Sequence, residues 1–180
     1  MQAVPVFVNT FFEERRAQLL SLAGLVEMAF ASAGLDYRIA GGLAAYLYAE
    51  EVDPDAGRLT KDIDIVVRRG ELESIAKAVE PFGLQHRNVG GVDMLVQAGK
   101  PSGRRAVHMI LEDGLGPCRL IGGVRLVPLI ELVRMKLTRF RVKDETHIVD
   151  LDELGLIAPE MESELSAIQR ERLPRARARE

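Results

Sequence analysis

The six residues Asp62–Val67 constrain the fold of this 180-residue chain more than any other segment. Aspartates stand at 62 and 64, and isoleucine or valine at 63, 65 and 67. That period of two is typical of a β-strand whose faces have different surroundings, and it predicts both aspartates on one face. Two adjacent half-buried carboxylates need a cation, and oxygen ligands favour a hard ion such as Mg²⁺. Asp62 and Asp64 are therefore candidate metal ligands, with a strand edge of solvated acids as the alternative.

The segment before this strand carries a glycine pair. Tyr37–Ala40 has the composition of a short strand, Gly41 and Gly42 end it, and Leu43–Glu50 has helical composition. Two glycines between a strand and a helix let backbone amides approach a phosphate closely. The pattern predicts a phosphate-binding turn, although a tight turn without a ligand would leave the same residues.

The order of these features resembles the core signature of minimal nucleotidyltransferase-fold proteins, and most closely the AbiEii-type toxin group. The matching residues are Ala40-Gly41-Gly42 and Arg58-Leu59-Thr60-Lys61-Asp62-Ile63-Asp64. The resemblance implies an α/β fold of the nucleotidyltransferase (polymerase-beta-like) type, with a mixed sheet flanked by helices and with C-terminal helices.

The resemblance also implies roles for residues. Gly41 and Gly42 would hold a nucleoside triphosphate, and Asp62 and Asp64 would bind Mg²⁺, with Mn²⁺ as a second candidate. The polar residues Thr60 and Lys61, which precede the first aspartate, would contact phosphate.

The C-terminal part extends the likeness. Val133–Leu137, then Lys143-Asp144 and Asp150-Leu151, is similar to the lysine helix and the following helix of that group. Lys136 lies in the apolar stripe of its expected helix. A core-facing lysine is costly unless its charge is paired or its head reaches a polar cavity. Lys136 is therefore expected to contact a nucleotide phosphate or to form a structural ion pair with Asp144.

Active members of the group usually carry a third carboxylate on a neighbouring strand. At the matching position of an expected hairpin, formed by Val92–Val96 and Ala106–Leu111, this chain has His108. Imidazole is a poor ligand for Mg²⁺ but is acceptable to Mn²⁺, and it suits a general base near neutral pH. Asp93, with similar apolar neighbours, is the other candidate, and a purely structural histidine is the third reading.

The remaining elements follow from periodicity and from turn residues. A capping box at Thr10 predicts the start of a helix that ends near Ala33. The sequence also predicts a helix from Leu72 to near Pro81, a hairpin over Arg119–Val127, helices over Pro128–Phe140 and Lys143–Leu154, and another from Pro159. Residues 1–180 are expected to form one domain with a core at about 37–154, and the basic tail from 170 to 180 is expected to be frayed.

Composition excludes several classes of protein. With 47% hydrophobic residues the chain is not disordered, and a single cysteine, Cys118, rules out an internal disulfide and a cysteine-based zinc cluster. A signal peptide and a bilayer-length apolar run are lacking, so a cytoplasmic protein without a membrane segment is expected. The formal net charge of -3 argues against bulk electrostatic attraction to nucleic acid.

Two functions follow from these features. The first is a metal-dependent enzyme that transfers a nucleoside monophosphate from an NTP to a protein, RNA or small-molecule acceptor. The second is a catalytically inactive nucleotidyltransferase-fold module that binds nucleotide or a partner protein. A toxin neutralised by an antitoxin partner is a third hypothesis. Whether Asp93 or His108 approaches the aspartate pair separates the first two.

Overall fold

The computed structural model describes residues 6–99 and 106–178, with side chains from Glu13 onwards. The chain divides into two compact units, which are described separately. The first unit combines the segment that ends at Tyr37 with Leu59–Leu115, and the second combines Arg38–Arg58 with the segment that begins at Gly116. The expectation of one domain stays a prediction.

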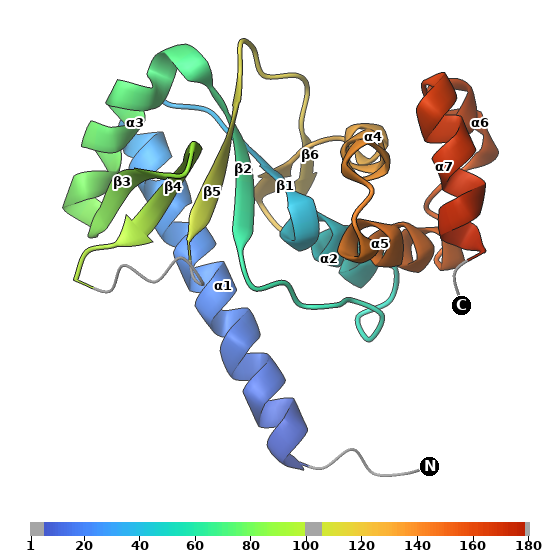
Figure 1. Ribbon diagram of the computed structural model, residues 1–180. Helices are drawn as coiled ribbons and strands as arrows, with labels where there is room; N and C mark the ends of the chain where they lie inside the picture. Colours follow the sequence, from blue (N-terminus) through green and yellow to red (C-terminus); the bar gives the residue numbers. More distant parts are fainter. Residues whose placement is uncertain (1–5, 100–105, 179–180) are drawn as a thin grey trace. The chain divides into compact units, whose positions relative to one another are not determined.

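The first unit contains a long helix, a four-stranded arrangement and a second helix (Figure 1). Its strands lie in the order β3-β4-β5-β2. β2 and β5 are parallel, and the other neighbours are antiparallel. Its elements are α1 (Val6–Ser32), β2 (Ile63–Arg68), η1 (Arg69–Glu71), α3 (Leu72–Val79), η2 (Glu80–Phe82), β3 (Leu84–Val89), β4 (Val92–Gln97) and β5 (Val107–Glu112).

The register of these strands separates two faces. Val107 lies opposite Ile63 on one side and opposite Leu95 on the other, and all three side chains are at most 1% exposed. His108 lies opposite Asp64 and Met94 in the same way. Because successive side chains of a strand alternate, the apolar face and the Asp64 face point in opposite directions. The expected alternation of residues 62–67 is confirmed from Ile63 onwards.

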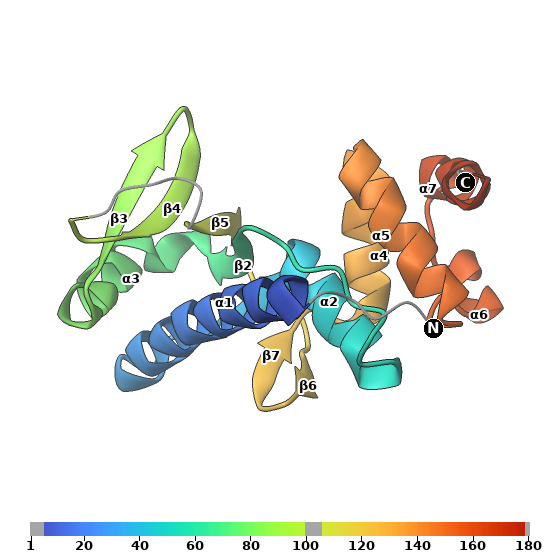
Figure 2. The same cartoon turned by 90° about the horizontal axis from the view of Figure 1, so that it is seen from below.

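Helix α3 contacts α1 and also packs beside β3. Figure 2 shows α3 and β3 next to each other. The interior side of α1 carries Val26, Ala29 and Phe30, which are nearly inaccessible to solvent. Phe30 packs edge-on against Tyr37, and the Tyr37 hydroxyl donates a hydrogen bond to Glu27. These contacts fix the C-terminal half of α1, which ends before Gly34, a residue with a φ of 64°.

The second unit contains a short three-stranded arrangement in the order β1-β7-β6 and five helices within the described residues. β1 and β7 are parallel, with Ile39 opposite Leu126, and β6 and β7 form the expected hairpin. Its elements are β1 (Arg38–Ala40), α2 (Gly41–Val52), β6 (Arg119–Ile121), β7 (Val124–Leu126), α4 (Leu129–Arg139), α5 (Val142–Glu153), α6 (Pro159–Ser163) and α7 (Ala167–Arg177).

The expected fold class is confirmed. Parallel and antiparallel strands occur together, helices flank them, and α4 to α7 form a helical C-terminal part. The strands predicted at Val92–Val96 and Ala106–Leu111 are antiparallel neighbours, β4 and β5. The connection of this expected hairpin lies mostly at residues 100–105, outside the described residues. In the described part of the chain, no helix has the length and apolar character that a membrane span requires.

The structure differs from the elements predicted by sequence in three places. α1 begins at Val6, so Thr10 lies inside the helix and does not cap it. The residues between Val6 and Thr10 include neither glycine nor proline, so nothing in them stops the helix from extending. β3 was not foreseen, because its outward positions carry polar side chains and only Leu84 is fully buried.

The basic tail is the third correction, because residues 167–177 form α7 instead of a frayed end. Ser166 caps the helix in a capping box with Gln169. Leu173 and Ala176 are 1% and 0% exposed, so the helix has an apolar side that packs in the second unit against α4 and α5. Arg177 adds ion pairs of 2.8 Å to both Asp152 and Glu162.

Candidate functional site

Asp64 and His108 form the centre of the candidate site in the first unit. The two residues lie opposite each other on parallel strands, and Nδ1 of His108 is 3.6 Å from Oδ1 of Asp64. Their side chains are 27% exposed for His108 and 20% for Asp64, so both are shielded on most sides yet open to a ligand. The arrangement combines an acceptor carboxylate with a group that can take up a proton.

Asp62 lies just before β2, in a bend, and is half-buried. The Thr60 hydroxyl holds its backbone: Asp62 N–H donates to Thr60 Oγ1 at 3.5 Å, and that hydroxyl donates to the Asp62 carbonyl at 3.3 Å. Thr60 thus shapes the entry into β2. Within residues 6–99 and 106–178, no three or more His, Cys, Asp or Glu side chains gather as a metal-binding group.

Asp93 lies on the other face of the strands. It immediately precedes Met94, the residue opposite His108, so its side chain points away from Asp64. Its carboxylate contacts His86 Nε2 at 2.8 Å and accepts a hydrogen bond from Asn88 at 3.0 Å. The Asn88 hydrogen bond, helped by His86, lowers the pKa of Asp93. The structure therefore brings His108, and not Asp93, to Asp64.

The contact between His86 and Asp93 was not foreseen from the sequence. The available signal was the Gly90-Gly91 pair, at which β3 turns into β4 and places Asn88 opposite Asp93. Recognising that turn would have shown which side chains meet across it.

The glycine pair lies in the second unit, at the start of α2. Gly41 follows β1 directly and has a φ of 66°, a left-handed conformation that favours glycine. Gly42 is buried in the first turn. The expected order of strand, glycine pair and helix is present, and the backbone amides of that first turn have no partners within the helix. Phosphate binding by Gly41 and Gly42 stays a prediction.

Comparison with known proteins identifies solved structures that have a similar fold. No family model and no curated protein matches the sequence. An antigenic nucleotidyltransferase-like protein from Paracoccidioides brasiliensis matches with a TM-score of 0.56 and 19% identity, over 88% of this chain and 86% of that chain. The antibiotic-resistance factor ANT(2'')-Ia, in its solution structure, matches with a TM-score of 0.52 and 15% identity, over 91% of each chain. This chain has a nucleotidyltransferase fold.

In this nucleotidyltransferase fold, Lys136 is almost wholly buried, with a side chain 3% exposed. Its Nζ lies 2.8 Å from His147 Nδ1 and 3.8 Å from Asp144 Oδ1. Asp144 also accepts a hydrogen bond of 2.7 Å from Arg141 Nε. The structural ion pair that the sequence offered as one reading of Lys136 is therefore present, and the phosphate contact stays a prediction.

The protonation states in this cluster follow from burial and charge. Burial, reinforced by the positive charge of Lys136, lowers the pKa of His147 from 6.5 to about 4. His147 is thus neutral at physiological pH, and its Nδ1 accepts the hydrogen bond that Lys136 donates. Burial raises the pKa of Asp144, but the Arg141 hydrogen bond and the Lys136 charge outweigh it, so this pKa is lowered overall.

Lys61, which was expected to contact phosphate, is exposed beside the start of β2. It lines a pocket that also includes Ile63, a residue of the face opposite to Asp64. In the nucleotidyltransferase fold of this chain, Lys61 is therefore next to a pocket on the face away from Asp64, and its phosphate contact stays a prediction.

Proposed function

We propose that this protein transfers a nucleoside monophosphate from an NTP to a hydroxyl group of a protein, RNA or small-molecule acceptor, in a metal-dependent reaction. The observation that carries the proposal is the Asp64–His108 pair, 3.6 Å apart on parallel strands. The nucleotidyltransferase fold supports it, because the sequence resemblance assigns the metal-binding role to the strand that carries Asp64. Half-buried acidic and imidazole groups side by side are typical of acid–base sites.

The residues present suit a magnesium ion. Mg²⁺ is usually held by one or two carboxylates together with substrate phosphates, so Asp62 and Asp64 form a sufficient protein donor set. When bound, the ion would neutralise charge on the triphosphate. The same carboxylate ligands also suit Mn²⁺.

We assign the proton transfer to His108. The acceptor oxygen forms a bond to the α-phosphorus, the bond between that phosphorus and the pyrophosphate oxygen breaks, and pyrophosphate leaves with the electron pair. The hydroxyl proton moves to the neutral imidazole. The nearby Asp64 carboxylate then stabilises the imidazolium that forms, because opposite charges 3.6 Å apart attract.

The test uses NTPs labelled at the α-phosphate, Mg²⁺ or Mn²⁺, and a cell extract that supplies acceptors. Wild-type protein is expected to transfer label, and Asp64→Asn to transfer almost none. Asp113→Asn is the matched control, since Asp113 is a 99% exposed aspartate in the same unit. Equal labelling by wild type and Asp64→Asn would overturn the proposal.

A second candidate function is a catalytically inactive module that binds nucleotide or a partner protein. The position of Asp93 favours it, because this carboxylate is bonded to His86 and Asn88 on the face away from Asp64. Asp64 then lacks a third acid from β4. Calorimetry that detects triphosphate binding by a protein without any transfer activity would support this function over the first.

We also propose a relation to the AbiEii-type toxins, with an antitoxin as partner. The run Arg58–Asp64 and the glycine pair support it. Expression of the wild-type chain is expected to slow bacterial growth and expression of Asp64→Asn to leave growth normal. Equal growth of both strains would contradict the toxin hypothesis.

A further inference from the structure

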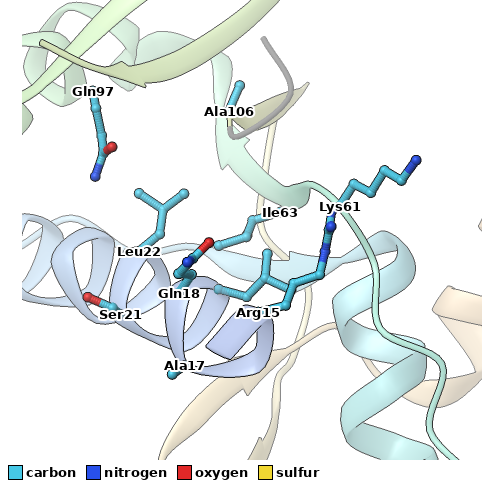
Figure 3. Close-up of a pocket in the computed structure, with 10 residues that line it drawn as sticks. Arg15, Ala17, Gln18, Ser21, Leu22, Lys61, Ile63, Gln97 and Ala106 are labelled. Carbon is cyan, nitrogen blue, oxygen red and sulfur yellow. The ribbon is translucent and has the colours of Figure 1, made fainter. Parts of the chain in front are cut away.

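A cavity of about 370 Å³ lies in the first unit between α1 and the apolar face of the strands (Figure 3). Sites that bind small molecules measure roughly 300–1,000 Å³, so its size is sufficient for a ligand. No residue that lines it belongs to the Asp64–His108 pair. The described residues that line it include Arg15, Ser21, Leu22, Lys61, Ile63 and Gln97.

The inner part of the cavity is apolar. Leu19, Leu22, Ile63 and Ala106 contribute to it and are between 0% and 8% exposed. The outer part is polar, and in Figure 3 the Gln97 side chain points toward α1. An apolar wall with a few polar groups at the opening is the usual composition of a small-molecule site.

The charge of the lining has one sign. Among the described residues that line it, Arg15 and Lys61 are the charged ones and none is acidic. Neither cation has a hydrogen-bond or ion-pair partner among the residues that the structure describes. In Figure 3 the Arg15 side chain extends toward the segment that carries Lys61, whose amine points away from Leu22 and Gln97. The opening therefore attracts an anion, with Arg15 as its main contact.

We propose that this cavity binds a small amphipathic anion, in which a carboxylate or phosphate head contacts Arg15 and an apolar body packs on Leu22 and Ile63. The site lies on the face opposite to the Asp64–His108 pair. Ile63 and Asp64 are consecutive on β2, so their side chains point to opposite faces. Ligand binding here does not depend on whether the chain is a nucleotidyltransferase.

Isothermal titration of the full-length protein tests the proposal with octanoate and octyl phosphate as probes. Octanol and octyltrimethylammonium have the same apolar chain with a neutral or a positive head. One anion is expected to bind at a 1:1 ratio, more tightly than either control, and the stronger of the two identifies the head group. Arg15→Gln should weaken this binding about tenfold, because it removes a charge-assisted hydrogen bond.

Two further variants sharpen the result. Arg16→Gln is the matched control, since Arg16 is the next residue of α1 but does not line the cavity, and it should bind as wild type does. Ser21→Phe, at an exposed helical position in the lining, should fill the cavity and abolish binding of both anions. Circular dichroism checks that each variant is folded. If Ser21→Phe does not fold, the comparison of Arg15→Gln with wild type tests the proposal by itself.

The proposal is overturned if neither anion binds at millimolar concentration. Equal binding of anion, alcohol and ammonium would show a site without selectivity for charge. Equal weakening by Arg15→Gln and Arg16→Gln would show general attraction to a basic helix. Each of these results excludes an anion site centred on Arg15.

Discussion

The imidazole of His108 and the carboxylate of Asp64 face each other from parallel strands, with 3.6 Å between their nearest nitrogen and oxygen. The two groups have different roles in the proposed reaction: His108 acts as the base, and Asp64 binds the metal ion. Their substitutions should therefore affect different measurable quantities.

Replacing His108 with glutamine keeps a polar side chain and removes the base. We expect the transfer rate to fall about 10²–10⁴-fold, the usual contribution of a general base, while the Mg²⁺ concentration for half-maximal activity stays constant. Asp64→Asn should instead raise that Mg²⁺ requirement. Steady-state rates over a magnesium titration separate the two variants, and a shifted magnesium requirement in His108→Gln would contradict the base assignment.

Replacing Asp93 with asparagine tests the separation of the two faces. The variant should transfer nucleotide at nearly the wild-type rate, because Asp93 points away from Asp64 and contacts His86 and Asn88. Rates are compared under identical conditions with those of Asp64→Asn. A loss as large as that of Asp64→Asn would return Asp93 to the catalytic group.

Replacing Lys136 with methionine removes the cation beside Asp144 and His147. Breaking a buried pair costs about 3–5 kcal/mol, and we expect the lower end because Asp144 keeps its hydrogen bond from Arg141. Urea unfolding measures the change. Lys143→Met, at an exposed position in α5, is the control and should change stability by less than about 0.5 kcal/mol.

The same variant addresses nucleotide binding by Lys136. If triphosphate affinity, measured well below the unfolding midpoint, equals that of wild type, the lysine is structural. A collapse of affinity with unchanged stability would assign it to phosphate contact instead.

The stability of the protein should depend on pH through His147, whose pKa is about 4 in the folded chain and 6.5 ordinarily. Between these values the unfolded chain binds a proton that the folded chain does not, so stability falls as pH decreases. The full loss from this residue is about 3 kcal/mol, and above pH 6.5 its contribution is constant. When the free energy of unfolding is measured from pH 7.5 to pH 4, it should decrease less steeply in His147→Gln than in the wild type.

Helix α7 should contribute to stability through Leu173, which is 1% exposed. Leu173→Ala is expected to cost about 2–5 kcal/mol, the usual effect of truncating a buried leucine. Ile168→Ala in the same helix is the control, because Ile168 is 48% exposed, and it should cost far less. Equal midpoints in thermal unfolding for Leu173→Ala and wild type would contradict the packing of α7.

The sequence predicted elements whose side chains alternate strongly or whose ends carry turn residues. β2 was foreseen from Ile63, Ile65 and Val67, which are all at most 1% exposed. The hairpin of β6 and β7 was foreseen from Gly122 and Gly123, which both have positive φ. In these cases the local pattern and the tertiary packing require the same residues.

The edge strand β3 and the C-terminal helix α7 lacked such patterns. β3 has a neighbour on one side only, β4, and its sequence is mostly polar. α7 contains several arginines and few apolar residues, which suggested a frayed end, although Ser166 and Gln169 form a capping box that the sequence shows. Its buried side is small, so hydrophobic periodicity alone does not detect it.

The candidate site was foreseen in residue type more than in geometry. Position 108 was recognised as the place of a missing acid, but sequence left Asp93 and His108 as alternatives. The pairings of His108 with Asp64 and with Met94 show that His108, and not Asp93, shares a face with Asp64. A shift of one residue in the pairing of β4 with β5 would have brought Asp93 to that face as well.

Side chains of β2 alternate between two faces, so a change in the length of this strand disturbs the protein more than a change of one residue type. Inserting or deleting one residue between Ile63 and the end of the strand would turn the following side chains to the opposite face. Conservative substitutions within β2 are therefore tolerable over evolution, whereas single-residue insertions and deletions in it would be eliminated.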